Sequence, residues 1–125
     1  MPNVRVKQTA YNQTTRSITA IPDHYVALTA VIPATAATQV GNKKYILAGT
    51  CVKNATELEG RKNGLEVVQA SEQFDGVIFS DQEVYEGEEK VTVTVLVHGF
   101  VKYAALQKVG GTVPTSKNAM ILVVK

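Results

Sequence analysis

Three side chains of this 125-residue sequence are suited to metal binding or nucleophilic chemistry: His24, His98 and the single cysteine, Cys51. A structural zinc site takes four nitrogen or sulfur ligands, usually including a closely spaced pair, and this sequence has no such pair. Cys51 and His98 would make a nucleophile and its base, but no motif orients one toward the other. No serine stands in the Gly-x-Ser-x-Gly turn that exposes the nucleophile of serine hydrolases. We therefore expect no catalytic residue, no metal site and no cofactor.

Oxygen ligands are concentrated between residues 72 and 89, a stretch with seven acidic residues and no basic one. The seven are Glu72, Asp75, Asp81, Glu83, Glu86, Glu88 and Glu89. Residues 81–87 alternate oxygen ligands as a calcium loop does, but lack the Asp-x-Asp-x-Asp-Gly order and the distal glutamate of an EF-hand. A glycosidase carboxylate pair would need a pocket with aromatic walls, and the chain has no tryptophan. A bound cation and glycoside hydrolysis are therefore less favoured than a solvated turn.

The composition indicates which elements must position these side chains. Valine, threonine and isoleucine account for 19, 13 and 6 of the 125 residues, and such β-branched side chains favour strands. We expect strands at 25–32, 44–48, 65–70, 77–79, 91–97 and 120–124, separated by Gly, Pro and Asn turn signals. About seven short strands and one short helix predict a mainly β fold, a small single-domain sandwich or barrel.

The strongest predicted strand covers residues 91–97. Its four valines share one face, which we expect to be core, while Thr92, Thr94, Leu96 and His98 share the other, half-polar face. Residues 103–109 are the best helix candidate. Residues 54–60 favour a single helical turn with Asn54 as its cap, and residues 33–39 favour a loop.

Length and charge exclude several classes of function. No apolar run approaches the roughly 18 residues of a membrane-spanning helix, and the sequence start lacks the apolar segment of a secretory signal. One cysteine allows no disulfide within the chain, which favours synthesis in a reducing compartment. The net charge of +2 is too small to indicate a nucleic-acid partner. We expect neither membrane nor nucleic-acid binding.

The first 20 residues differ from the rest and are expected to form an extended arm, with residues 21–125 as one β-rich domain. Val4 and Val6 alternate with Arg5 and Lys7, and no acidic residue precedes Asp23. The basic leader and the acidic middle have two interpretations. They are either solvated polar segments or surfaces that meet different partners or neighbouring subunits, because charge complementarity sets register and encounter rate.

One part of the sequence resembles a known family. The resemblance rests on residues 75–81 (DGVIFSD), Val84, the turn at Glu86-Gly87, the valine-rich strand 91–97 and the following residues 98–101 (HGFV). Together they resemble the C-terminal half of the head decoration proteins of tailed bacteriophages. The resemblance covers about residues 70–106, with a looser similarity in residues 45–52.

The resemblance implies a β-rich, non-enzymatic protein without a cofactor. It implies a trimer on the outside of the phage head, at or near three-fold axes, that binds the major capsid protein and stabilises the expanded shell. The protein would be made in the host cytoplasm and located on the virion. The N-terminal arm of this family commonly contributes to the capsid contact. The arm residues expected to bind the capsid are Val4, Arg5, Val6, Lys7, Tyr11 and Arg16.

The residues suit this role because an extended arm with alternating valines can add a strand to an exposed sheet edge. Two alternatives remain open. One is a virion-surface β module, such as a head fibre or adhesin domain, that binds host-cell carbohydrate through exposed aromatic side chains. The other is a small cytoplasmic enzyme or metal-binding domain, for which the sequence offers few ligands.

Overall fold

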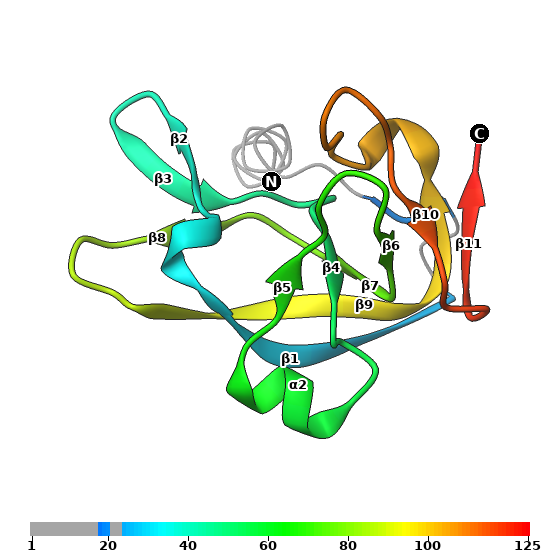
Figure 1. Ribbon diagram of the computed structural model, residues 1–125, viewed down its shortest axis with the longest axis horizontal. Helices are drawn as coiled ribbons and strands as arrows, with labels where there is room; N and C mark the ends of the chain where they lie inside the picture. The colour runs from blue at the N-terminus through cyan, green and yellow to red at the C-terminus, as the bar shows by residue number, and fades with distance from the viewer. Residues whose placement is uncertain (1–17, 21–23) are drawn as a thin grey trace, which may run out of the picture.

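The computed structural model describes residues 18–20 and 24–125 and shows a mainly β fold with one short α-helix in those ranges (Figure 1). The fold class predicted from the sequence is therefore confirmed. Eleven strands are present in the described part: β1 (Tyr25–Pro33), β2 (Thr38–Val40), β3 (Lys43–Ile46), β4 (Cys51–Lys53), β5 (Glu66–Val67), β6 (Gln73–Phe74), β7 (Gly76–Ile78), β8 (Gln82–Val84), β9 (Lys90–Lys102), β10 (Thr115–Ser116) and β11 (Ile121–Val124).

The main sheet is built around β9, the longest strand. The strand order is β1-β9-β7-β4-β5, and β11 also pairs with β9. The whole length of β1 pairs antiparallel with β9, whereas β11 runs parallel to the last residues of β9. This arrangement follows from the sequence, since β9 carries the valine- and threonine-rich stretch that suits a long pleated strand.

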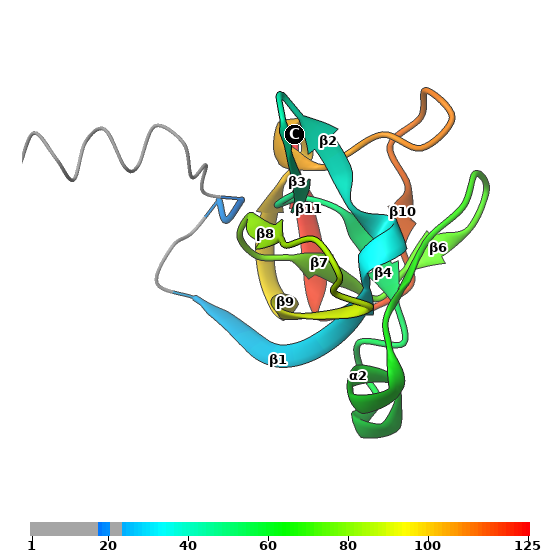
Figure 2. The same cartoon turned by 90° about the vertical axis from the view of Figure 1, so that its left-hand side faces the viewer.

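Two smaller sheets extend this frame. β2, β3 and β8 form an antiparallel sheet that projects to one side of the molecule, together with the turn from β8 into β9 (Figure 1). β6 and β10 form a short parallel pair. Figure 2, which views the molecule from its side, shows α2 (Leu58–Asn63) lying beyond β4 at the edge of the body.

The central strands are buried on both faces, so the core has two parts. One, the Val95 cluster, consists of Ala30, Ile32, Ile46, Val52, Ala55, Leu65, Ile78, Val91, Val93 and Val95. The other, the Leu96 cluster, consists of Ile18, Ala48, Cys51, Val68, Phe74, Val77, Leu96, Val101, Leu106 and Ile121. Successive residues of a strand point to opposite faces, so Val95 and Leu96 place the two clusters on the two sides of the sheet.

The predicted alternation of β9 holds from Val91 to Val97, but the face expected to be half-polar is also part of the core. Val97 is half-buried and packs against the Val95 cluster, whereas Leu96 is fully buried in the Leu96 cluster on the opposite face. The pairing of β9 with β1 shifts at Val97, because Val26 lies opposite His98 and Ala27 lies opposite Leu96. One extra residue in β9 makes a β-bulge, which interrupts the alternation after Val97, so that Val101 lies in the same cluster as Leu96.

Gly99 follows this bulge and allows the close approach of β1. Its φ is +146°, and a Cβ atom there would lie 3.0 Å from both the His24 carbonyl oxygen and the Tyr25 Cβ. A side chain at position 99 would therefore be strained in conformation and crowded by β1.

The predicted helix at 103–109 was wrong. Only Tyr103–Ala105 form a turn, of the 3-10 type, before the chain continues irregularly. The α-helix is Leu58–Asn63, later than the predicted turn at 54–60, and its N-cap is Glu57 rather than Asn54. Asn54 has a φ of +74° and its side chain donates to Glu66, so it forms a turn before the helix.

The remaining strand predictions were correct in part. The expected strand at 65–70 is the two-residue β5, and the loop expected at 33–39 contains a 3-10 turn, Ala34–Ala36, and the start of β2. The strands at 25–32, 77–79 and 120–124 correspond to β1, β7 and β11 within one or two residues. Two-residue strands such as β6 and β10 carry too short a pattern to be read from sequence.

Candidate functional site

The residues predicted to bind a capsid lie outside the described residues. These are Val4, Arg5, Val6, Lys7, Tyr11 and Arg16. The structure does describe where the leader joins the body. The Ala20 amide donates to the Phe100 carbonyl at 2.7 Å, and the Lys102 amide donates to the Ile18 carbonyl at 2.8 Å. Ile18 itself is buried in the Leu96 cluster, so the attachment point is fixed beside the end of β9.

Apolar and imidazole side chains gather on the sheet at this end of the molecule. The set comprises His24, Val26, His98, Phe100, Leu122 and Val124, which we call the sheet-end face. The register places Val26 opposite His98 and Leu122 opposite Phe100, so these pairs share a face. The His24 ring lies 5.4 Å from the His98 ring and 5.8 Å from the Phe100 ring, measured between centroids.

The sheet-end face is unusually open for apolar side chains. Val26, Leu122 and Val124 are 44%, 53% and 43% exposed. The same side of the sheet is covered farther along β1, where α2 lies against β1 and Leu65 is buried in the Val95 cluster. An uncovered apolar patch of this kind marks an interaction surface more often than a random part of the surface does.

Two lysines border the sheet-end face. Lys102 lies opposite Val124 in the β9–β11 register, and the Lys125 ammonium lies 5.2 Å from the centre of the Tyr103 ring. A partner for this face would therefore combine apolar and acidic groups.

Most of the acidic stretch 72–89 serves the protein's own structure. Asp81 Oδ1 accepts a hydrogen bond from the Ala48 amide at 2.7 Å, and Glu88 Oε1 accepts one from the Tyr85 amide at 2.7 Å. Glu83 lies 4.0 Å from the Lys43 ammonium. Within the described part of the chain, Glu86 and Glu89 have no hydrogen bond or ion pair through their side chains.

Glu72 forms the closest ion pair. Its Oε2 lies 2.6 Å from Lys53 Nζ, and Glu66 lies 3.8 Å from the same ammonium. The hydrogen bond from Lys53, together with the Gln69 amide, lowers the pKa of the Glu72 carboxyl. The same bond to Glu72 raises the pKa of Lys53. Both groups are exposed enough that the pair contributes little to stability.

Asp75 and Asn118 link four segments of the chain, and the sequence indicated neither role. Asp75 Oδ1 accepts from the Ala55 amide at 3.0 Å, and Oδ2 accepts from the Thr56 hydroxyl at 3.2 Å. Asn118 Nδ2 donates to the Asp75 carbonyl at 3.0 Å and to the Val97 carbonyl at 2.9 Å. The Asp-Gly pair indicated only a turn, and nothing in the sequence distinguished Asn118 from other loop asparagines.

Cys51 and His98 are not brought together as a catalytic pair. Cys51 is buried in the Leu96 cluster, where desolvation raises the pKa of its thiol to about 12. Its Sγ lies 3.7 Å from the Gly49 carbonyl oxygen. A thiol with so high a pKa is protonated at neutral pH and is a poor nucleophile. His98 instead lies on the sheet-end face against His24.

Exposed aromatic side chains, which the carbohydrate-binding alternative requires, lie on separate elements. Tyr85 is on the β8–β9 turn, Tyr103 is in the 3-10 turn after β9, and Tyr25 stacks on Phe79 at 4.9 Å between centroids. The β8–β9 turn and the β2–β3 hairpin line a hollow of about 500 Å³. Among residues 18–20 and 24–125, no group of three His, Cys, Asp or Glu side chains could hold a metal ion.

The helices offer no membrane span: none in the described ranges is long and apolar enough to cross a bilayer. Comparison of the chain with protein-family models, with curated proteins and with solved structures found no match.

Proposed function

We propose that this chain is a bacteriophage head decoration protein. It binds the major capsid protein on the outer surface of the expanded head and holds neighbouring capsid subunits together, as trimers near three-fold axes. It acts on the virion after synthesis in the host cytoplasm. The role is structural and uses no catalytic residue and no cofactor.

The observation that carries this proposal is the resemblance of residues 75–101 to the head decoration family. In the fold, these residues make one connected unit. β7 pairs with β9 through Val77 opposite Leu96 and Ile78 opposite Val95, and β8 leads through the acidic turn into β9. Asn118 donates to the carbonyls of both Asp75 and Val97 in this unit. The resemblance therefore covers paired strands of the core rather than scattered surface residues.

The place where the leader joins the body also suits the proposal. Thr19 pairs with Val101, so the leader departs from the end of the longest strand, beside the apolar and basic sheet-end face. A segment that starts from a fixed point has a smaller ordering cost on binding than one on a free tether. Several arms held in one trimer would multiply weak contacts by avidity.

Co-sedimentation with expanded heads assembled without this protein tests the proposal. The full chain is expected to pellet with the heads and to raise the temperature at which they release DNA. A variant that lacks residues 1–16 is expected to stay in the supernatant, because it loses the arm that carries Arg5, Lys7 and Arg16. Its circular dichroism spectrum and melting temperature should match those of the full chain, since Ile18 and the body are intact.

The matched control replaces Lys108 and Lys117 with alanine, which removes positive charge from the body and leaves the leader unchanged. This control should still pellet with the heads. Equal pelleting of the truncated and full chains would contradict the role of the arm. Failure of the full chain to pellet with any such head would contradict capsid binding as a whole.

A further inference from the structure

The turn between β8 and β9, residues 85–89, is an acidic tip with an exposed aromatic side chain. Tyr85 is 62% exposed, although aromatic side chains are usually at least half-buried. Glu86 and Glu89 lie on the same turn and, within the described residues, have no partner for their side chains. Glu88 holds the turn by accepting the Tyr85 amide, and the Glu88 amide donates back to the Tyr85 carbonyl at 3.2 Å. The tip is thus a formed turn that presents an apolar ring among carboxylates, with Lys43 and Lys44 of β3 lining the hollow on its inner side.

The sheet-end face offers the complementary chemistry. Val26, Leu122 and Val124 supply an apolar surface. Lys102 lies opposite Val124, and Lys125 follows Val124 with its ammonium over the Tyr103 ring, so both supply positive charge at this end. β11 pairs only with β9 among the described strands, so its outer edge also lacks a neighbour there. Unpaired edges of apolar strands are sites of association.

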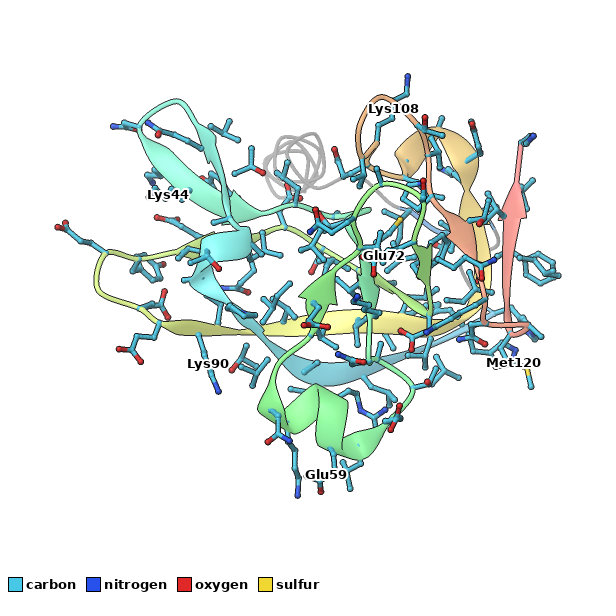
Figure 3. All side chains as sticks on the ribbon, viewed as in Figure 1. Lys44, Glu59, Glu72, Lys90, Lys108 and Met120 are labelled. Carbon is cyan, nitrogen blue, oxygen red and sulfur yellow. The ribbon has the colours of Figure 1, made fainter. Side chains whose placement is uncertain are left out.

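One molecule cannot bring these two surfaces together. The β8–β9 turn and β11 lie at opposite ends of the long axis of the molecule (Figure 1). Figure 3 shows the same separation through two labelled side chains, with Lys44 near the end that carries the acidic tip and Met120 at the start of β11. Only a second molecule can place an acidic tip against a sheet-end face.

We propose that the acidic tip of one copy of this chain docks on the sheet-end face of a second copy, with Tyr85 against Val26 and Leu122 and with Glu86 and Glu89 facing Lys102 and Lys125. The contact is head-to-tail, so each copy keeps one surface open unless a ring closes. This proposal rests on the proposed function: the contact is the one through which copies of the chain would associate into trimers. Because the contact forms between free molecules, its test needs no capsid. The contact between copies and the binding to the capsid can therefore be shown or refuted independently of each other.

Sedimentation velocity of the full chain over a range of concentrations tests the contact. At roughly 20 mM salt, where the screening length is on the order of 20 Å, the chain should self-associate, and association should weaken at roughly 500 mM salt. The double variants Lys102→Glu/Lys125→Glu and Glu86→Lys/Glu89→Lys should each associate on the order of tenfold or more weakly, because each turns two attractions into repulsions. Tyr85→Ser should also weaken association without changing net charge.

The decisive measurement is the equimolar mixture of the two charge-reversed variants. The first carries two acidic surfaces and the second two basic ones, so the mixture should associate where neither variant does alone. The control Lys62→Glu/Lys108→Glu makes the same change in net charge as Lys102→Glu/Lys125→Glu, on exposed residues away from both surfaces (Figure 3), and should associate like the unaltered chain. Circular dichroism spectra should be the same for all variants. A monomeric unaltered chain, unchanged association of either reversed variant, or a mixture that stays monomeric would each overturn the contact.

Discussion

The two hydrophobic clusters on either side of β9 are assembled from different parts of the chain. The Val95 cluster takes its residues from positions 30–95, mostly from neighbouring strands of the main sheet. The Leu96 cluster takes Ile18 and Ile121 from near the two ends of the described chain, and Leu106 from the turn after β9. The first cluster is therefore a product of strand alternation, whereas the second depends on segments that meet only in the completed fold.

This difference has a consequence for stability and for function. The residues that close the Leu96 cluster, Ile18 and Ile121, belong to the segments that border the sheet-end face. A partner that binds this face, or pulls on the leader, therefore acts on the Leu96 cluster, whose residues lie far apart in the sequence. Contacts between residues far apart in sequence carry the larger loop-closure cost, so this side should be the later to form.

The largest expected effect comes from a charge in the Val95 cluster. Val95→Asp should destabilise the fold by more than about 4 kcal/mol, because an unpaired carboxylate would be buried where the side chain is fully enclosed. The melting temperature should fall by about 15 °C or more. Thr94→Asp is the matched control, since Thr94 is the preceding residue of the same strand and is exposed. Similar melting temperatures for the two variants would show that the alternation of β9 does not define this cluster.

A smaller effect is expected from the closing segment of the Leu96 cluster. Ile121→Ala should reduce the free energy of unfolding by about 2–4 kcal/mol, since Ile121 is 3% exposed and its truncation leaves a cavity. Leu122→Ala, one residue later and exposed, should change it by less than about 0.5 kcal/mol. Urea denaturation measures both. If Ile121→Ala were as mild as Leu122→Ala, β11 would be only an accessory to the core rather than part of it.

The sequence predicted the Val95 cluster much better than the Leu96 cluster. Alternation in the valine-rich strand identified Val91, Val93 and Val95, because a half-buried strand repeats every two residues. It failed at Leu96, which it placed on a half-polar face, because the Leu96 cluster covers that face as well. Ile18, Leu106 and Ile121 stand in short or irregular segments without a period, so only tertiary contacts reveal that they are buried.

The same reasoning applies to the candidate site. Charge counting found an acidic middle and a leader without acids, but it could not tell carboxylates with internal partners from free ones. Asp75 and Asp81 accept backbone amides from segments 20 and 33 residues away, and such long-range bonds leave no local signal. The sheet-end face was also missed, because it combines the start of β1, the end of β9 and β11, which are distant in sequence.

The smallest expected effect concerns the ion pair between segments that supply both clusters. Lys53 follows Val52 of the Val95 cluster, and Glu72 shortly precedes Phe74 of the Leu96 cluster. The folded-state pKa of Glu72 is lowered mainly by the hydrogen bond from Lys53, so its contribution is fully present above the pKa of an unfolded glutamate, about 4.3. That contribution is lost as the pH falls through the lower, folded-state pKa.

The variant Glu72→Gln should therefore be slightly less stable than the unaltered chain at neutral pH and equally stable in acid. Thermal melts from pH 7 down to about pH 3 measure the difference. Glu66→Gln is the matched control, because Glu66 lies farther from the same ammonium, at 3.8 Å, and should leave the pH dependence nearly unchanged. If Glu72→Gln were still less stable than the unaltered chain in acid, the loss of stability would come from packing or from the hydrogen bond of the Gln69 amide, and not from charge. The link between the two clusters would then be made by their apolar contacts alone.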